Sequence, residues 1–186
     1  MDETSRQQVR ESRVSRPVQP GAPAIYDYEY ERCGVSNLFM LFAPLEGWRR
    51  VEVTARRTKV DWAKLIKSLV DEAYPDKRIV LVMDNLNTHA PGSLYEAFEP
   101  AEARRIAGRL EIHYTPKHGS WLNMAEVEIG VMVRQCLERR IPDRDFLRNE
   151  VKAWQDCRNR EAVVVDWRFT TDDARIKLRS LYPSIQ

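Results

Sequence analysis

The chain of 186 residues has few cysteines, few glycines and no long apolar run. Its three cysteines, Cys33, Cys136 and Cys157, are too few and too scattered for a disulfide framework or a zinc cluster, which favours a reducing, cytoplasmic setting. Seven glycines leave no phosphate-binding glycine loop, and no stretch approaches the roughly 20 apolar residues of a membrane span. The polar start MDETSRQQ is no signal peptide. We therefore expect a cytoplasmic protein without a membrane span.

An excess of one charge is also lacking, because 30 Lys and Arg residues face 28 Asp and Glu residues, for a net charge of +2. This balance neither requires nor excludes nucleic acid, since the distribution of charge decides that question. Basic residues cluster at 49–50, 56–59, 104–105 and 139–140. Such clusters suit phosphate contacts, and they are equally typical of a solvated surface.

Apolar residues make up 43% of the chain, enough for a sizeable core. Their spacing alternates between strand and helix patterns, which predicts an α/β protein. Residues 3–24, rich in Arg and Pro, are expected to be an extended basic segment, with ordered structure beginning at Tyr26. The expected elements are a hairpin of 35–44 and 48–55, a helix capped by Thr58, a strand at 78–85 buried on both faces, a helical stretch at 92–108 broken near Pro100, a strand at 110–115, helices at 121–139 and 143–160, a short strand at 163–167, and a final helix at 171–179.

Asp84 is the first candidate site residue. It closes an apolar strand, at the carboxyl edge where open α/β sheets bind ligands. Asn85 and His89 follow within a few residues, so polar groups converge there. The alternative is an Asp that begins the loop and caps the next segment, as Asp and Asn commonly do.

Glu126 is the second candidate, because the helical repeat places it on a stripe with Leu122, Ile129 and Val133. Glu128 lies about 200° around the same helix, which assigns it to a more polar face. An acid on an apolar stripe is usually paired or functional. The alternative is an acid at the edge of the stripe that reaches water.

Two or three carboxylates from different elements at one sheet edge are suited to hard divalent cations such as Mg²⁺ or Mn²⁺. The histidines are less informative. His113 and His118 have no third ligand nearby and are most simply polar loop residues, whereas His89 either hydrogen-bonds a ligand or caps a turn.

The segments HYTPKHGSWLNMAEVE (113–128) and VLVMDNLNTH (80–89) resemble the catalytic domain of bacterial insertion-sequence transposases related to mariner elements, a DDE superfamily endonuclease group known as insertion-sequence family 630. MDET (1–4), YDYEYER (26–32), NLFMLFAPLEGWRRVEVTARRT (37–58) and DWRFTTDDARIKLRSLYP (166–183) look like the same family. The resemblance implies a ribonuclease-H-like mixed sheet flanked by helices, and nearly the whole chain takes part in it.

The resemblance also implies a site of three acids. It matches the first to Asp2 in MDET, the second to Asp84 in DNLNTH and the third to Glu126 in LNMAE. These acids would serve as catalytic residues and as ligands of Mg²⁺ or Mn²⁺. It names four further residues as supporting or DNA-contacting candidates: Asn85, His89, Lys117 and Asn123.

The implied activity is metal-dependent hydrolysis of phosphodiesters at transposon ends and strand transfer into target DNA. The implied partners are DNA and a homo-oligomer with full-length transposase, with no small-molecule cofactor. In the family, helix-turn-helix modules precede the first acid, so the resemblance also leads us to expect an amino-terminally truncated chain. Residues 1–24 would then be the end of a largely missing first strand plus the basic segment, and residues 25–186 the catalytic domain. The alternative is an inactive remnant that associates with DNA or transposase; a stand-alone nuclease is less favoured.

Overall fold

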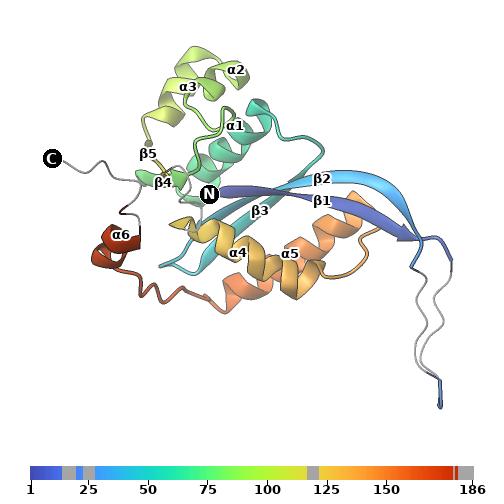
Figure 1. The fold of residues 1–186 in the computed structure, drawn as a ribbon. Helices are drawn as coiled ribbons and strands as arrows, with labels where there is room; N and C mark the ends of the chain where they lie inside the picture. Colours follow the sequence, from blue (N-terminus) through green and yellow to red (C-terminus); the bar gives the residue numbers. More distant parts are fainter. Residues whose placement is uncertain (14–19, 23–27, 117–121, 178, 180–186) are drawn as a thin grey trace.

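The computed structural model describes residues 1–13, 20–22, 28–116, 122–177 and 179, and Figure 1 shows their arrangement. Strands and helices alternate along the chain as the apolar spacing predicts. The elements are β1 (Asp2–Glu11), β2 (Tyr30–Ala43), β3 (Trp48–Thr54), α1 (Lys59–Ser68), η1 (Leu69–Ala73), β4 (Ile79–Met83), α2 (Gly92–Ala97), α3 (Pro100–Ala107), β5 (Leu110–Tyr114), α4 (Met124–Met132), η3 (Val133–Leu137), α5 (Arg144–Arg160) and α6 (Thr171–Lys177).

The strands form two sheets. One is antiparallel in the order β1-β2-β3, with Asp2 paired to Met40 at the start of β1. The other is a parallel pair, β4 and β5. The ammonium of Met1 donates a hydrogen bond of 2.7 Å to the carbonyl of Val82, so the beginning of β1 lies against β4 and brings the two sheets together.

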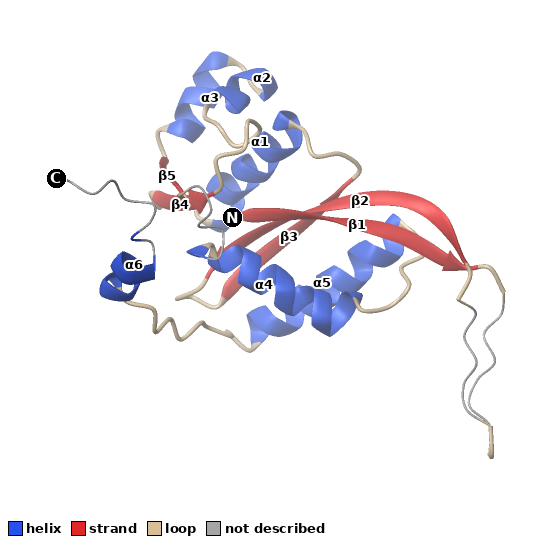
Figure 2. Cartoon of the chain, in the orientation of Figure 1, coloured by secondary structure: helices blue, strands red, loops and turns tan. Residues whose placement is uncertain are grey.

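Strand β2 is the centre of the core, because successive side chains of a strand point to opposite faces. Phe39 and Leu41 pack with α1, α2, α3 and β4, whereas Leu38 and Met40 pack with α4, η3 and α5. Figure 2 shows the antiparallel sheet between these two groups of helices. The molecule therefore has helices on both faces of β2, and each face has its own apolar cluster.

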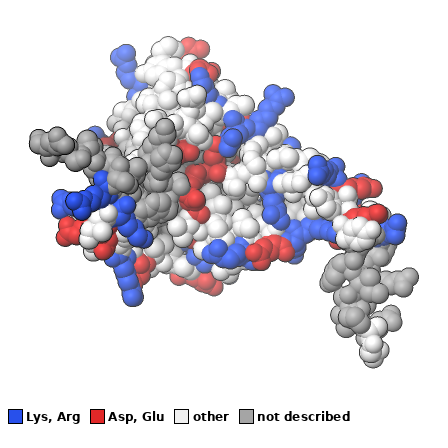
Figure 3. All heavy atoms as spheres, in the orientation of Figure 1, with Lys and Arg blue, Asp and Glu red and all other residues white. Residues whose placement is uncertain are grey.

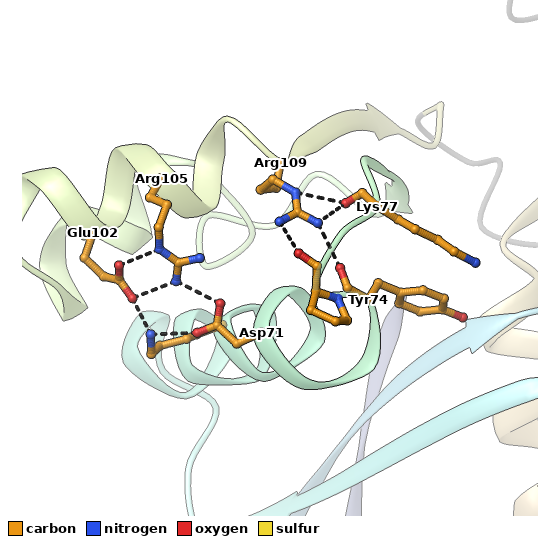
Figure 4. Close-up of polar contacts among 8 residues, drawn as sticks. Asp71, Tyr74, Lys77, Glu102, Arg105 and Arg109 are labelled. Carbon is orange, nitrogen blue, oxygen red and sulfur yellow. Dashed lines mark hydrogen bonds and ion pairs between the residues drawn. The ribbon is translucent and has the colours of Figure 1, made fainter.

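Ion pairs hold α3 against α1 and η1, and hydrogen bonds from Arg109, just before β5, hold the loop that follows η1 (Figure 4). Arg105 donates hydrogen bonds to Asp71 at 2.8 Å and to Glu102 at 2.7 Å. These contacts to Arg105, together with Lys67, lower the pKa of Glu102 to about 2. Arg109 donates to three carbonyl groups of the loop before β4, those of Tyr74, Pro75 and Lys77. The position of β4, and of the residue that follows it, is fixed through this loop.

Several sequence predictions are correct in kind. Thr58 and Asp61 form the predicted capping box of α1. The stretch 92–108 is two helices, with Pro100 in the first turn of the second. Asp143 caps α5 through the amide of Phe146.

Three predictions about elements are wrong. Residues 2–11 form β1, so ordered structure begins at Asp2 and not at Tyr26; the backbone pairing with β2 stabilises this strand although its sequence has no apolar alternation. Residues 163–167 form no strand, and Val165 donates to the carbonyl of Pro44 in a loop. Finally, β4 is buried on one face only, since its sheet has just two strands among the described residues and the side chains of Val80 and Val82 are exposed.

Among the described residues, no helix has the length and apolar character that crossing a membrane would require.

Candidate active site

Four acidic residues line one cavity of about 330 Å³, and three of them, Asp2, Asp84 and Glu126, come from separate parts of the fold. Asp2 begins β1, Asp84 directly follows β4, and Glu126 lies in the first turn of α4. Figure 3 shows acidic side chains gathered near the middle of the visible face, in the region where β1 begins in Figure 1. The other lining residues are Glu3, Thr4, Thr115, Asn123 and Ile129.

The three carboxylates are close enough to affect one another. Burial raises the pKa of Asp2 above its ordinary value, and the charges of Asp84 and Glu126 raise it further. The backbone amide of Glu3, 2.7 Å from Asp2 Oδ1, and the Met1 ammonium act in the opposite direction. The cavity therefore holds an accumulation of negative charge that a cation would relieve.

Asn123 fixes α4 relative to β1. Its side-chain oxygen accepts a hydrogen bond from the amide of Ala125, which caps the helix, and its Nδ2 donates to the carbonyl of Met1 at 3.0 Å. The side chain is almost completely buried. Because Met1 directly precedes Asp2 and Asn123 lies three positions before Glu126, this contact sets the place of Glu126 relative to Asp2.

His89 connects Asp84 to β1. Its Nδ1 lies 2.5 Å from Asp84 Oδ1, and its Nε2 lies 3.0 Å from Glu3 Oε2. Arg57 lies 3.0 Å from the second oxygen of Glu3, as an ion pair that lacks hydrogen-bond geometry. The backbone of the His89 loop is held by Tyr114, whose hydroxyl donates to the carbonyl of His89 at 3.0 Å.

The model of one protein family, described as DDE superfamily endonuclease, matches residues 1–148. The chain belongs to this family. The match includes all five strands, α4 and the three acids of the cavity. No curated protein and no solved structure matches the chain. Family membership makes this a nuclease-type enzyme domain with DNA as its class of substrate, and the mixed α/β architecture is compatible with the predicted ribonuclease-H-like fold.

Endonucleases of the DDE superfamily generally use divalent metal ions. The donor set in the cavity fits a hard cation, since it consists of carboxylate oxygens that repel one another. As the side chains stand, no three His, Cys, Asp or Glu groups within the described part of the chain are already arranged around a metal position. An ion would have to draw the carboxylates of the DDE endonuclease domain together.

The remaining predicted residues have different environments. His89 and Asn123 are buried beside the cavity and hold its acids, as described above. Asn85 is exposed in the loop after β4. Lys117 lies outside the described residues.

The sequence analysis put Glu126 on the apolar stripe of α4 and Glu128 on a more polar face, and this prediction is wrong. Glu126 is exposed to the cavity side, whereas the carboxylate of Glu128 is only 3% exposed. The buried face of α4 consists of Ala125, Glu128, Ile129 and Met132, and Glu128 is tolerated there because Arg49 and Arg158 each lie 2.9 Å from its Oε1. The apolar spacing could not reveal this, since both arginines come from distant elements.

Sequence reasoning also missed Glu3 and Arg57. Glu3 stands near the start of the chain, where side chains are usually frayed, yet its side chain is only 2% exposed. The one available signal was its position next to Asp2 in the MDET segment. Nothing in the sequence pattern connects Arg57 to it.

Proposed function

We propose that this DDE endonuclease domain is the catalytic domain of a bacterial insertion-sequence transposase, related to mariner elements and belonging to insertion-sequence family 630. Its reaction would be hydrolysis of phosphodiesters at transposon ends, followed by attack of the freed 3′-hydroxyl on target DNA. The observation that carries the proposal is the convergence of Asp2, Asp84 and Glu126 on one cavity of a chain that belongs to the DDE superfamily.

The three carboxylates would hold Mg²⁺ or Mn²⁺ in this cavity. Bound there, the ions would stabilise the attacking and leaving oxygens of an in-line displacement at phosphorus. The chain's own residues supply position and charge: Asn123 holds the start of α4 against β1, and His89 holds the carboxylate of Asp84. Asn85, which is exposed and next to Asp84, would contact the DNA that enters the site.

Strand cleavage of a labelled duplex that carries the terminal repeat of the encoding element tests this proposal. We expect cleavage with Mg²⁺ or Mn²⁺ and its loss when EDTA removes the metal. Asp84→Asn should reduce cleavage to the level of the EDTA control, because a metal-binding carboxylate is lost. The matched control is Asp76→Asn, which changes an exposed Asp in the turn before the same strand and should cleave like the wild type.

Undiminished cleavage in EDTA would contradict the mechanism. A protein that shifts the same duplex in a gel but never cleaves it would instead support the alternative of a DNA- or transposase-associating protein.

A further inference from the structure

His89 is a fully buried imidazole with a carboxylate at each ring nitrogen. Asp84 lies on one side, at the cavity, and Glu3 of β1 lies on the other. Strand alternation places Glu3 on the same face of β1 as Met1, toward the apolar cluster that contains Trp62. The ring of His89 lies 6.1 Å from that of Trp62, so packing as well as hydrogen bonding restricts its orientation.

Buried charged groups are stable only when they are paired. An imidazole can contact one partner at each ring nitrogen, and both partners of His89 are carboxylates. The guanidinium of Arg57 lies 3.0 Å from Oε1 of Glu3 and balances the charge of that carboxylate. The side chains of Arg57, Glu3, His89 and Asp84 thus form a continuous row of contacts from the surface near α1 to the cavity; we name them the Arg57–Asp84 chain.

Asp84 depends on this chain for its orientation. It stands in the loop after β4, and residues 85–87 of that loop are exposed. Its Oδ1 is held by His89, and its Oδ2 has no hydrogen-bond partner among the described residues. Glu126 has no comparable support, since no side chain in the described part of the molecule binds its carboxylate.

We propose that Glu3 and Arg57, acting through His89, are positioning residues that hold the carboxylate of Asp84 for metal binding with one oxygen left free. This inference rests on the proposed function, because it requires that Asp84 is a metal ligand. Partners of metal-binding side chains typically contribute about 10- to 100-fold to metal affinity or activity.

Isothermal titration calorimetry of the full chain with Mn²⁺ measures metal affinity. It therefore tests the inference without depending on catalysis. We expect Glu3→Gln and His89→Phe to weaken Mn²⁺ binding about tenfold or more. His89→Gln keeps one N–H donor for Asp84, so its loss should be smaller than that of His89→Phe. Circular dichroism of each variant shows whether it is folded.

Arg57 gives the sharpest comparison, because its side chain is 47% exposed and its replacement does not open the core. Arg57→Gln should weaken Mn²⁺ binding severalfold, and Arg57→Lys, which keeps the charge, should restore most of it. Arg56→Gln removes the same charge from the preceding, exposed residue and should bind Mn²⁺ like the wild type.

The two proposals fail in different ways. A wild-type chain that binds no Mn²⁺ would overturn the proposed function and this inference with it. Folded Glu3→Gln, His89→Phe and Arg57→Gln variants that bind Mn²⁺ as tightly as the wild type would overturn the inference alone.

Discussion

Glu126 and Glu128 are two residues apart on one helix and have opposite surroundings. Glu126 lines the cavity and has no buried partner in the described structure, whereas Glu128 is enclosed with two arginines. Burial lowers the pKa of Arg49, and the charge of Glu128 opposes that effect, so each member of the pair stabilises the other. The same residue type therefore serves the site at one position and the fold at the other.

Substitution separates these two roles. Glu128→Ala leaves buried arginine charge without its partner and should lower the free energy of unfolding by about 3 kcal/mol. Glu126→Gln alters a surface carboxylate and should change that free energy by less than about 0.5 kcal/mol, while abolishing strand cleavage. Urea denaturation measures the first quantity and the labelled-duplex assay the second. Normal cleavage by Glu126→Gln would remove it from the proposed ligands.

At the scale of single elements, two helices begin with a side-chain cap. Thr58 caps α1 in a capping box, and Asn123 caps α4 while also donating to the carbonyl of Met1. Thr58 is not among the residues that line the cavity, whereas Asn123 is. Substitutions at Thr58 and at Asn123 therefore separate an effect on helix stability from an effect on the geometry of the site.

We expect Thr58→Ala and Asn123→Ala each to lower the free energy of unfolding by about 1 kcal/mol, the usual value of such a cap. Only Asn123→Ala should also weaken Mn²⁺ binding, because the start of α4 is no longer held against β1. Denaturation with urea and calorimetric titration give the two values. Equal Mn²⁺ affinity of both variants would show that Asn123 acts on the helix alone.

At the scale of the whole molecule, the two apolar clusters share strand β2, so neither should unfold without the other. With 5-fluorotryptophan incorporated, Trp62 reports on one cluster and Trp154 on the other. Both fluorine signals should lose their native positions at one urea concentration. Phe39→Ala, on the face toward Trp62, should lower that midpoint for both signals and cost about 3 kcal/mol or more. Two separate midpoints in the wild type would contradict the shared core.

Local sequence patterns were sufficient to predict those structural features that neighbouring residues determine. The cap at Thr58, the break before Pro100 and the placement of Asp84 after an apolar strand follow from neighbouring residues. Strand β1 could not be predicted in this way, because its stability comes from pairing with β2, whose paired residues lie 19 to 38 positions further along the chain.

The site shows the same division between local and distant causes. Asp84 was accessible to sequence reasoning as a strand-ending acid, whereas Asp2 came only from the resemblance to a family. The burial of Glu3, His89 and Glu128 depends on charges supplied by other elements, and no periodicity encodes such pairings. Apolar spacing locates a face, and only the folded chain shows which charges are paired on it.

The double burial of β2 has a consequence for how the protein can diverge. In a strand with one solvent-exposed face, every second position can be replaced by a polar residue during evolution. From Leu38 to Leu41 that freedom does not exist, since all four side chains are at most 2% exposed and belong alternately to the two clusters. Relatives of this chain should therefore keep an unbroken apolar block at these positions, and should vary more in the part of β1 from Ser5 to Glu11, where most side chains are half-buried or exposed.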